Sequence, residues 1–239
     1  MNIKKSLFYM LPIYIAVLAV MIGTVYSGSS LTSAALQKYP ACQRTCVIID
    51  PGHGGEDGGA TSCTGILESK YNLDISLRLN DLMHLLGMKT YMTRTEDRSI
   101  YKTGNTIGEK KISDIHERVR IVDHTVPAIL ISIHQNFFPE PQYKGAQILY
   151  ASSSESREIA QMLQKQLIIS LNSNPNRTEK RGRGVYLLDH IKNPGVLIEC
   201  GFLSNPEEEA MLRNETYQKQ LCSVIACQMS IYLNSRLSA

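Results

Sequence analysis

The sequence of 239 residues predicts one α/β domain, a twisted and mostly parallel β-sheet with helices on both faces. Short apolar runs alternate along the chain with longer amphipathic segments, which is typical of a sheet covered by helices. Polar clusters rich in glycine or acids follow several of the apolar runs. The hydrophobic content of 43% and charged content of 20% are those of a folded globular protein.

The periodicity of apolar residues gives the expected elements. Strands are expected at residues 46–50, 88–93, 128–133, 145–150, 184–188 and 195–200. Helices are expected at residues 68–86, 113–124, 155–171 and 217–233. In the first helix Tyr71, Ile75 and Leu79 share one face. Ser113 is the expected N-cap of the second. The polar stretch 99–112 before it is expected to be a long loop, and loops of this length are often functional.

The N-terminus predicts a membrane or export segment. Residues 7–26 contain no charge, and a helix of about 20 apolar residues spans a hydrocarbon core. Lys4 and Lys5 precede this run and favour a cytoplasmic N-terminus. A cleaved signal peptide remains the alternative to a retained anchor. We therefore divide the chain into an anchor or signal at 1–30, a tether at 31–45 and an extracytoplasmic catalytic domain at 46–235, membrane-anchored or secreted.

Composition argues against nucleic acid as a partner. The formal net charge is only +3, Trp is absent and four Phe are present. No stripe of lysine and arginine is interleaved with aromatic residues. The six cysteines of an exported chain permit disulfides, but their spacing fixes no pairing. Cys200, inside an apolar run, is expected to be a core residue.

Three polar clusters stand where predicted strands end. They contain His53 in a glycine-rich turn, His134 after an apolar run, and Glu199 in another apolar run. In open α/β sheets ligands bind at the carboxyl ends of strands, so these side chains are expected at one sheet edge. Glu68 opens the helix that returns to this edge. Taken alone, Glu68 is more simply explained as a favourable partner of the helix dipole.

Two histidines and one glutamate form a common catalytic zinc shell that leaves a position for water. A further carboxylate must then accept and return a proton, and Glu199 suits this role because apolar strands rarely bury an unpaired acid. A lone histidine is more often a core or surface residue than a ligand. That reading is adopted for four others: His84, His116, His124 and His190.

These residues carry a family resemblance. The segments Ile-Ile-Asp-Pro-Gly-His53-Gly-Gly, Leu-Glu68, Ser-Ile-His134-Gln-Asn and Ile-Glu199-Cys-Gly-Phe-Leu-Ser-Asn-Pro resemble, in order, the zinc N-acetylmuramoyl-L-alanine amidases of the Amidase_3 type. The resemblance implies one Zn²⁺ held by His53, Glu68 and His134, with Glu199 as catalytic base. It implies cleavage of the amide between N-acetylmuramic acid and L-alanine in peptidoglycan. Gln135 and Cys200 depart from common residues of the family without removing a ligand or the base.

The chain also resembles the sporulation members of this family, which combine a short membrane segment with a lone catalytic domain. This implies a role in forming muramic-δ-lactam in the cortex, and a place in the envelope of the spore. The expected partners are glycan strands, stem peptides and the membrane. Whether an activating protein is a further partner is left open by the sequence. The alternatives are a zinc peptidase that cuts within the stem peptide and a wall-binding protein without activity.

For the other polar residues, both a role in substrate binding and an ordinary structural role are open. Arg94 and Asp97 could contact substrate or form an exposed ion pair, and Asn136 could bind substrate or cap its loop. A basic stretch could attract the carboxylates of the stem peptide or be a solvated loop. It comprises Arg177, Lys180, Arg181 and Arg183.

Overall fold

The computed structural model describes residues 45–171 and 173–236. The predicted anchor or signal at 1–30 and the tether up to residue 44 lie outside this range, so the structure does not bear on them. Within the described residues no helix is long and apolar enough to cross a membrane.

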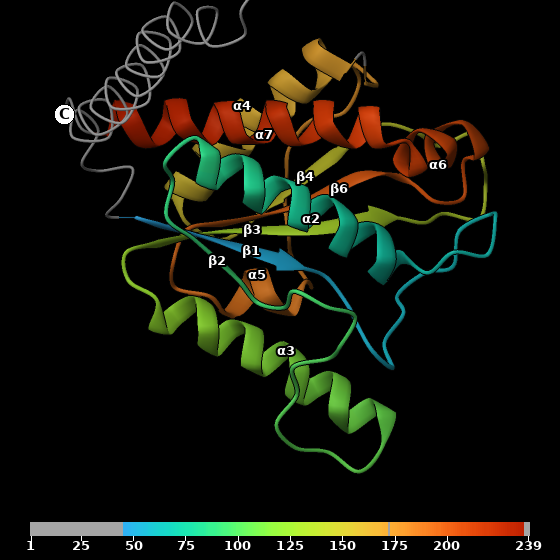
Figure 1. Ribbon diagram of the computed structural model, residues 1–239, viewed down its shortest axis with the longest axis vertical. Coiled ribbons are helices and arrows are strands. Elements are labelled where there is room, and N and C mark those ends of the chain that lie inside the picture. Colours follow the sequence, from blue (N-terminus) through green and yellow to red (C-terminus); the bar gives the residue numbers. More distant parts are fainter. Residues whose placement is uncertain (1–44, 172, 237–239) are drawn as a thin grey trace, which may run out of the picture. The chain divides into compact units, whose positions relative to one another are not determined.

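The described part contains one six-stranded sheet in the order β2-β1-β3-β6-β4-β5 (Figure 1). The strands are β1 (Cys46–Pro51), β2 (Thr90–Met92), β3 (Ala128–Asn136), β4 (Gln147–Tyr150), β5 (Lys180–Arg181) and β6 (Gly195–Phe202). Neighbours β2, β1, β3 and β6 are parallel, as are β4 and β5. The β4–β6 pair is antiparallel, so the sheet is mixed. The connection between β3 and β4 carries no helix, and a parallel neighbour needs a longer crossover.

Helices cover both faces of the sheet, as predicted. One face packs against α2 (Glu68–Leu85), α4 (Ser154–Leu171), α6 (Pro206–Arg213) and α7 (Glu215–Ser235), and the other against α3 (Ile107–His124) and α5 (Tyr186–His190). Ile49 of β1 belongs to the first core and Ile48 to the second. This alternation follows from the two-residue period of a strand. Both sides of β1 are therefore buried.

Two predicted elements are wrong in type or extent. Residues 184–188 were expected as a strand, but Tyr186–His190 form helix α5. A short apolar run does not distinguish a strand from a buried helix. Helix α3 begins at Ile107 instead of residue 113, because Thr106 and Glu109 form a capping box. The loop predicted at 99–112 therefore covers only residues 99–106. Helix α6 and strand β5 were not predicted.

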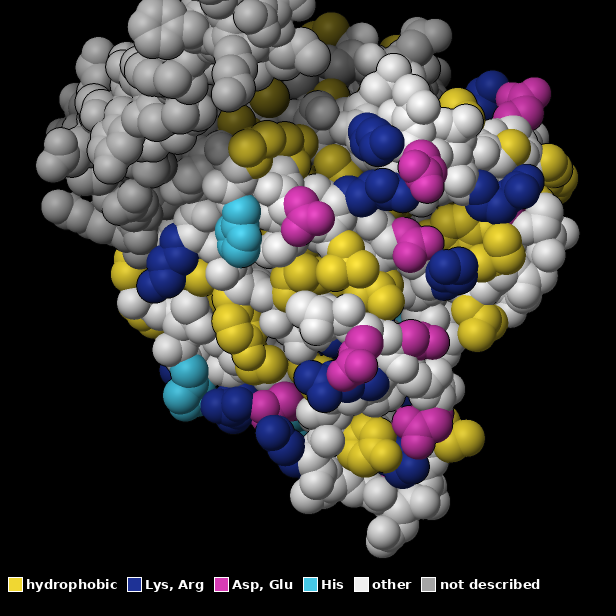
Figure 2. Space-filling view, in the orientation of Figure 1, with side chains coloured by type: hydrophobic (Ala, Val, Ile, Leu, Met, Phe, Trp, Pro, Cys, Tyr) yellow, Lys and Arg dark blue, Asp and Glu magenta, His cyan; other side chains and the backbone are white. Residues whose placement is uncertain are grey.

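The described cysteines carry free thiols, and Cys200 is buried in the core as predicted. On the molecular face in Figure 2, basic and acidic side chains are interspersed and neither sign forms a broad field. This arrangement agrees with the small net charge of +3.

Candidate active site

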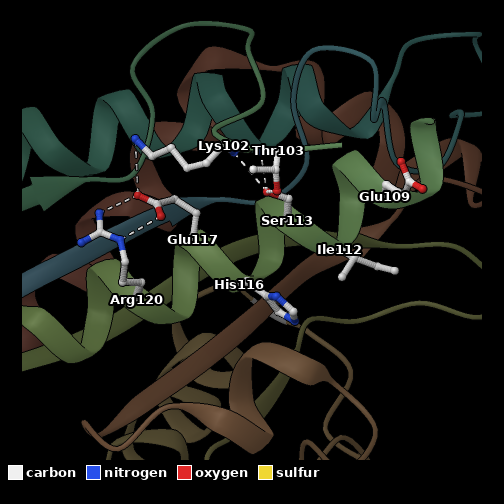
Figure 3. A pocket seen from close by; sticks show the side chains of 8 residues that line it. All are labelled: Lys102, Thr103, Glu109, Ile112, Ser113, His116, Glu117 and Arg120. Carbon is white, nitrogen blue, oxygen red and sulfur yellow. Dashed lines mark hydrogen bonds and ion pairs between the residues drawn. The ribbon is translucent and has the colours of Figure 1, made fainter. Parts of the chain in front are cut away.

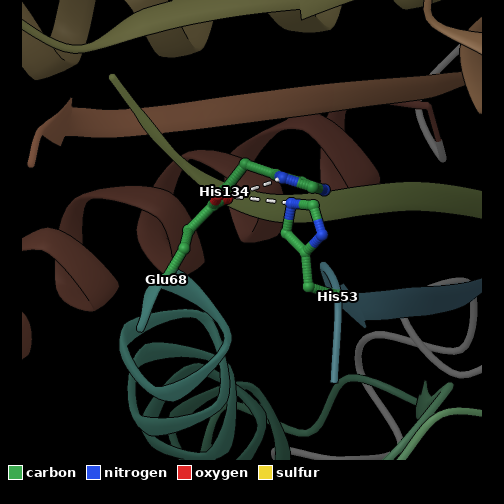
Figure 4. Close-up of side chains that lie close together, drawn as sticks. All are labelled: His53, Glu68 and His134. Atoms are coloured by element: carbon green, nitrogen blue, oxygen red, sulfur yellow. Dashed lines mark hydrogen bonds and ion pairs between the residues drawn. The ribbon is translucent and has the colours of Figure 1, made fainter. Parts of the chain in front are cut away.

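Three of the predicted site residues meet at the carboxyl edge of the sheet (Figure 4). His53 follows β1, His134 lies near the end of β3, and Glu68 is the first residue of α2. One potential ligand atom from each lies within 4.8 Å of the others. The two carboxylate oxygens of Glu68 face different rings, with Oε2 3.2 Å from His53 Nε2 and Oε1 3.0 Å from His134 Nδ1. Two imidazoles and a carboxylate are a donor set that suits zinc.

Glycines make the space in which these side chains meet. A Cβ atom at Gly52 would stand 2.1 Å from Nε2 of His134. A Cβ atom at Gly59 would stand 2.6 Å from Oε2 of Glu68 and 2.7 Å from Cδ2 of His53. Neither position accommodates any side chain without displacing a candidate ligand. The glycine-rich sequence around His53 is thus explained by close approach of the backbone.

The pKa shifts of His53 and Glu68 also fit a cation site. Burial alone would lower the pKa of His53, but hydrogen bonds to Asp57 and Glu68 outweigh it and raise the pKa to about 9. Burial would raise the pKa of Glu68, yet His134 and His53 hold it well below its usual range. In the absence of metal, a proton on His53 therefore balances the carboxylate charge. A metal ion would replace that proton.

Glu199 lies beside this group on β6. Its Cα is paired in register with that of His134 on the neighbouring strand. Its Oε2 atom is buried and has no hydrogen-bond partner among the described residues. Burial raises the pKa of Glu199 to about 7, against the opposing attraction of His134. A carboxylate with this pKa is well matched to general base catalysis near neutral pH.

A buried ionic network fixes the loop that carries His53. Asp50, at the end of β1, accepts hydrogen bonds from Thr93 (2.6 Å), Ser132 (2.8 Å) and the guanidinium of Arg118. Arg118 of α3 also donates to the carbonyl of His53 at 2.8 Å. These contacts tie the start of the loop to α3 and β3. The role of Asp50 and Arg118 was not predicted from the sequence.

Arg94 has neither of the two predicted roles. Only 1% of it is exposed, so it is no surface ion pair. It donates to the carbonyls of Pro51, Gly52 and Ser69 at 2.9–3.0 Å. Arg94 therefore holds the backbone on both sides of the site. Asp97 accepts a hydrogen bond of 3.0 Å from the amide of Gly55 and supports the same loop.

The remaining candidates stay apart from the three-residue group. The four histidines interpreted as ordinary are not among the clustered ligands. Two members of the basic stretch have partners of their own, since Arg177 lies over the ring of Phe202 and Arg181 pairs with Asp189. Asn136 ends β3, where its carbonyl accepts a hydrogen bond from Leu203 at 2.8 Å. Its predicted contact with substrate stays a prediction.

A cavity of about 150 Å³ opens beside the site on the α3 and α5 side of the sheet. His53, His134, Asp57, Lys111 and Tyr186 are among its lining residues. Asp57 pairs with His53 through a short hydrogen bond, and Lys111 forms an ion pair with Asp57. Neither residue was singled out from the sequence. The one available signal was an acid four residues after a candidate metal ligand.

A larger hollow of about 390 Å³ lies between residues 102–103 and α3 (Figure 3). Glu117 stands in its wall and pairs with Arg120 at 2.5 Å and with Lys102 at 3.7 Å. The charges that face this hollow thus neutralise one another. None of the candidate ligands lines it, and we assign it no function.

Replacing Gly52 by alanine is expected to lower kcat/KM by about 100-fold, because the imidazole of His134 must move to admit the new Cβ. Gly108 in the first turn of α3 is the matched control, since a Cβ there meets nothing within 4 Å. Gly108→Ala is expected to preserve activity. Equal activity of Gly52→Ala and wild-type enzyme in a peptidoglycan digestion assay would contradict the close approach.

Comparison with known proteins places this chain in a family. The family model of N-acetylmuramoyl-L-alanine amidases matches residues 47–229. The germination-specific N-acetylmuramoyl-L-alanine amidase of Bacillus subtilis (strain 168) is 36% identical over 181 residues, which cover 75% of this chain and 76% of that protein. The amidase LytC of the same organism is 27% identical, and the match covers 34% of its length.

Solved structures agree with the sequence comparison. The CwlD amidase from Clostridioides difficile, in complex with the GerS lipoprotein, superposes with a TM-score of 0.76 at 34% identity and covers 80% of this chain and 99% of that one. An N-acetylmuramoyl-L-alanine amidase from Clostridium difficile 630 has a TM-score of 0.70 at 28% identity, over 80% of this chain and 97% of that one. The chain therefore belongs to the N-acetylmuramoyl-L-alanine amidase family.

Proposed function

We propose that His53, Glu68 and His134 hold one zinc ion and that Glu199 is the catalytic base of peptidoglycan amide hydrolysis. The observation that carries this proposal is the shared carboxylate of Glu68, which faces both histidines, with Glu199 on the adjoining strand. The space left by Gly52 and Gly59 supports it. When bound, zinc polarises the amide carbonyl and lowers the pKa of a water molecule.

Residues of the chain carry out the proton transfer and hold the site in place. Glu199 accepts the proton of the attacking water and returns it to the nitrogen of the leaving L-alanine. The bond that breaks joins this nitrogen to the lactyl carbonyl of N-acetylmuramic acid. Because Oε2 of Glu199 has no hydrogen-bond partner among the described residues, it is free to bind the proton. Asp50 and Arg118 hold the His53 loop at the sheet edge during the reaction.

The biological setting that we propose is the spore cortex. Support comes from the germination-specific relative, which matches three quarters of both chains. Removal of the stem peptide by this amidase would prepare N-acetylmuramic acid for closure to muramic-δ-lactam. The substrate lies outside the cytoplasm, as expected if residues 1–30 act as an anchor or export signal. A lipoprotein partner is part of the proposal, since the similar CwlD amidase was solved with one.

Digestion of purified peptidoglycan by the full-length enzyme in detergent tests the reaction. The expected products are stem peptides with a free N-terminal L-alanine and glycan with bare lactyl groups. Mass spectrometry that found cleavage only between amino acids would identify a peptidase instead. No cleavage by the zinc-loaded protein, with or without a lipoprotein partner, would leave a wall-binding protein. For the cortex role, unchanged muramic-δ-lactam in spores that lack this protein would be the contrary result.

A further inference from the structure

The loop after His53 folds a second carboxylate against this histidine. Residues Gly54 and Asp57 form an antiparallel bridge, with N–O distances of 2.8 and 3.2 Å between their backbones. His53 has a φ of 60° and is the one residue besides glycine with positive φ in the described part of the chain. Such a conformation persists only where the surroundings hold it. The bridge turns Asp57 back towards the His53 ring.

The two nitrogens of His53 face two different acids. Nδ1 lies 2.8 Å from Oδ2 of Asp57, and Nε2 lies 3.2 Å from Oε2 of Glu68. The hydrogen bond to Asp57 places a proton on Nδ1 and leaves Nε2 for a metal. In metal sites a carboxylate that accepts from the far nitrogen fixes the tautomer and the orientation of the ring.

Helix α3 holds Asp57 in turn. Nζ of Lys111 lies 2.8 Å from Oδ1 of Asp57, the oxygen that His53 does not use. The preceding residue, Lys110, pairs with Glu56 at 2.7 Å. Two consecutive lysines thus bind two consecutive acids of the loop, but only the pair of Asp57 and Lys111 continues to a candidate ligand. Glu56 and Lys110 provide a natural reference for an ion pair that merely supports the loop.

We propose that Asp57 is a positioning residue that orients His53 towards the zinc ion and that Lys111 fixes Asp57 in this role. The inference rests on the zinc site proposed above. Asp57 acts through His53 and touches no substrate. The Lys110–Glu56 pair has no such role, although its geometry is equally good.

Zinc affinity, measured on the full-length protein by competition with a fluorescent chelator, separates these roles without using activity. Asp57→Ala is expected to weaken zinc binding about 10-fold to 100-fold. Asp57→Asn, which keeps an oxygen for the Nδ1 proton, is expected to lose less zinc affinity. Lys111→Met is expected to lower zinc affinity about twofold to fivefold, because the ion pair of Lys111 with Asp57 is partly exposed. Lys110→Met should bind zinc as the wild-type protein does.

Long-range ¹H–¹⁵N spectra of the histidine rings give the second measurement. In zinc-loaded protein we expect a proton on Nδ1 of His53, and in metal-free Asp57→Ala a mixture of tautomers. Wild-type zinc affinity in folded Asp57→Ala would overturn the inference while leaving the zinc site intact. Equal losses in Lys110→Met and Lys111→Met would overturn the role of Lys111. A wild-type protein without stoichiometric zinc would instead contradict the proposed function.

Discussion

Glu199→Gln is expected to lower kcat about 10²-fold to 10⁴-fold, the usual contribution of a general base. The amide has nearly the shape of the carboxylate, but it cannot accept the proton of water. Zinc content is expected to remain at one ion, since Glu199 is not among the clustered ligands. Turnover of defined muropeptides, with metal analysis of the same samples, checks both expectations. Full activity of this variant would remove Glu199 from the mechanism.

The same substitution is expected to stabilise the metal-free protein at neutral pH. Burial raises the pKa of Glu199 to about 7, so the folded state binds its proton more tightly than the unfolded state does. The folded protein thus loses stability as pH rises from about 4.5 to 7, on the order of 3 kcal/mol in total. Glutamine carries no such penalty. The midpoints of thermal unfolding of the two metal-free proteins should differ far more at pH 8 than at pH 5.

A surface acid supplies the matched control. Glu207, at the first turn of α6, has a side chain that is 82% exposed. Glu207→Gln is expected to change neither turnover nor the dependence of stability on pH. If both glutamate variants lost activity equally, the loss would reflect a general effect of charge and not proton transfer.

The sequence predicted the sheet and its buried strands well because those strands have uninterrupted apolar runs. Residues 128–133 and 195–200 lie within β3 and β6. It failed at α5, where Tyr186, Leu187 and Leu188 form a run too short to show a period. It also missed residues 107–112 of α3, because the capping box of Thr106 and Glu109 lies within a polar stretch. Local hydrogen bonds decided the structure there, not hydrophobic pattern.

At the site, the positions of strand ends predicted where His53, His134 and Glu199 would lie. The family resemblance implied the role of Glu68 as a metal ligand. Sequence could not predict the residues that hold this group. Asp50 and Arg118 are 68 residues apart, and each looks like an ordinary surface charge until the fold buries them together. Lys111 likewise reaches Asp57 only because α3 packs over the loop. Such contacts depend on tertiary structure alone.

Glu68→Gln is expected to abolish zinc binding at micromolar metal and to reduce activity to background. The substitution leaves an oxygen facing one histidine, places an amide nitrogen against the other, and removes the negative charge that they share. Saturating zinc, at about 1,000 times the dissociation constant, should stabilise the wild-type protein by about 4 kcal/mol. The variant should show almost none of this gain. Thermal unfolding with and without zinc provides the measurement.

Asp74→Asn is the control in the same helix, since Asp74 is partly exposed and pairs with Lys70 at 3.3 Å. It should gain as much stability from zinc as the wild-type protein. The pH dependence adds a second test. Because the pKa of His53 is about 9 without metal, zinc must displace a proton at pH 7, and wild-type zinc affinity should rise between pH 7 and pH 9. A zinc affinity of Glu68→Gln equal to that of the wild-type protein at both pH 7 and pH 9 would contradict the role of this carboxylate as a ligand.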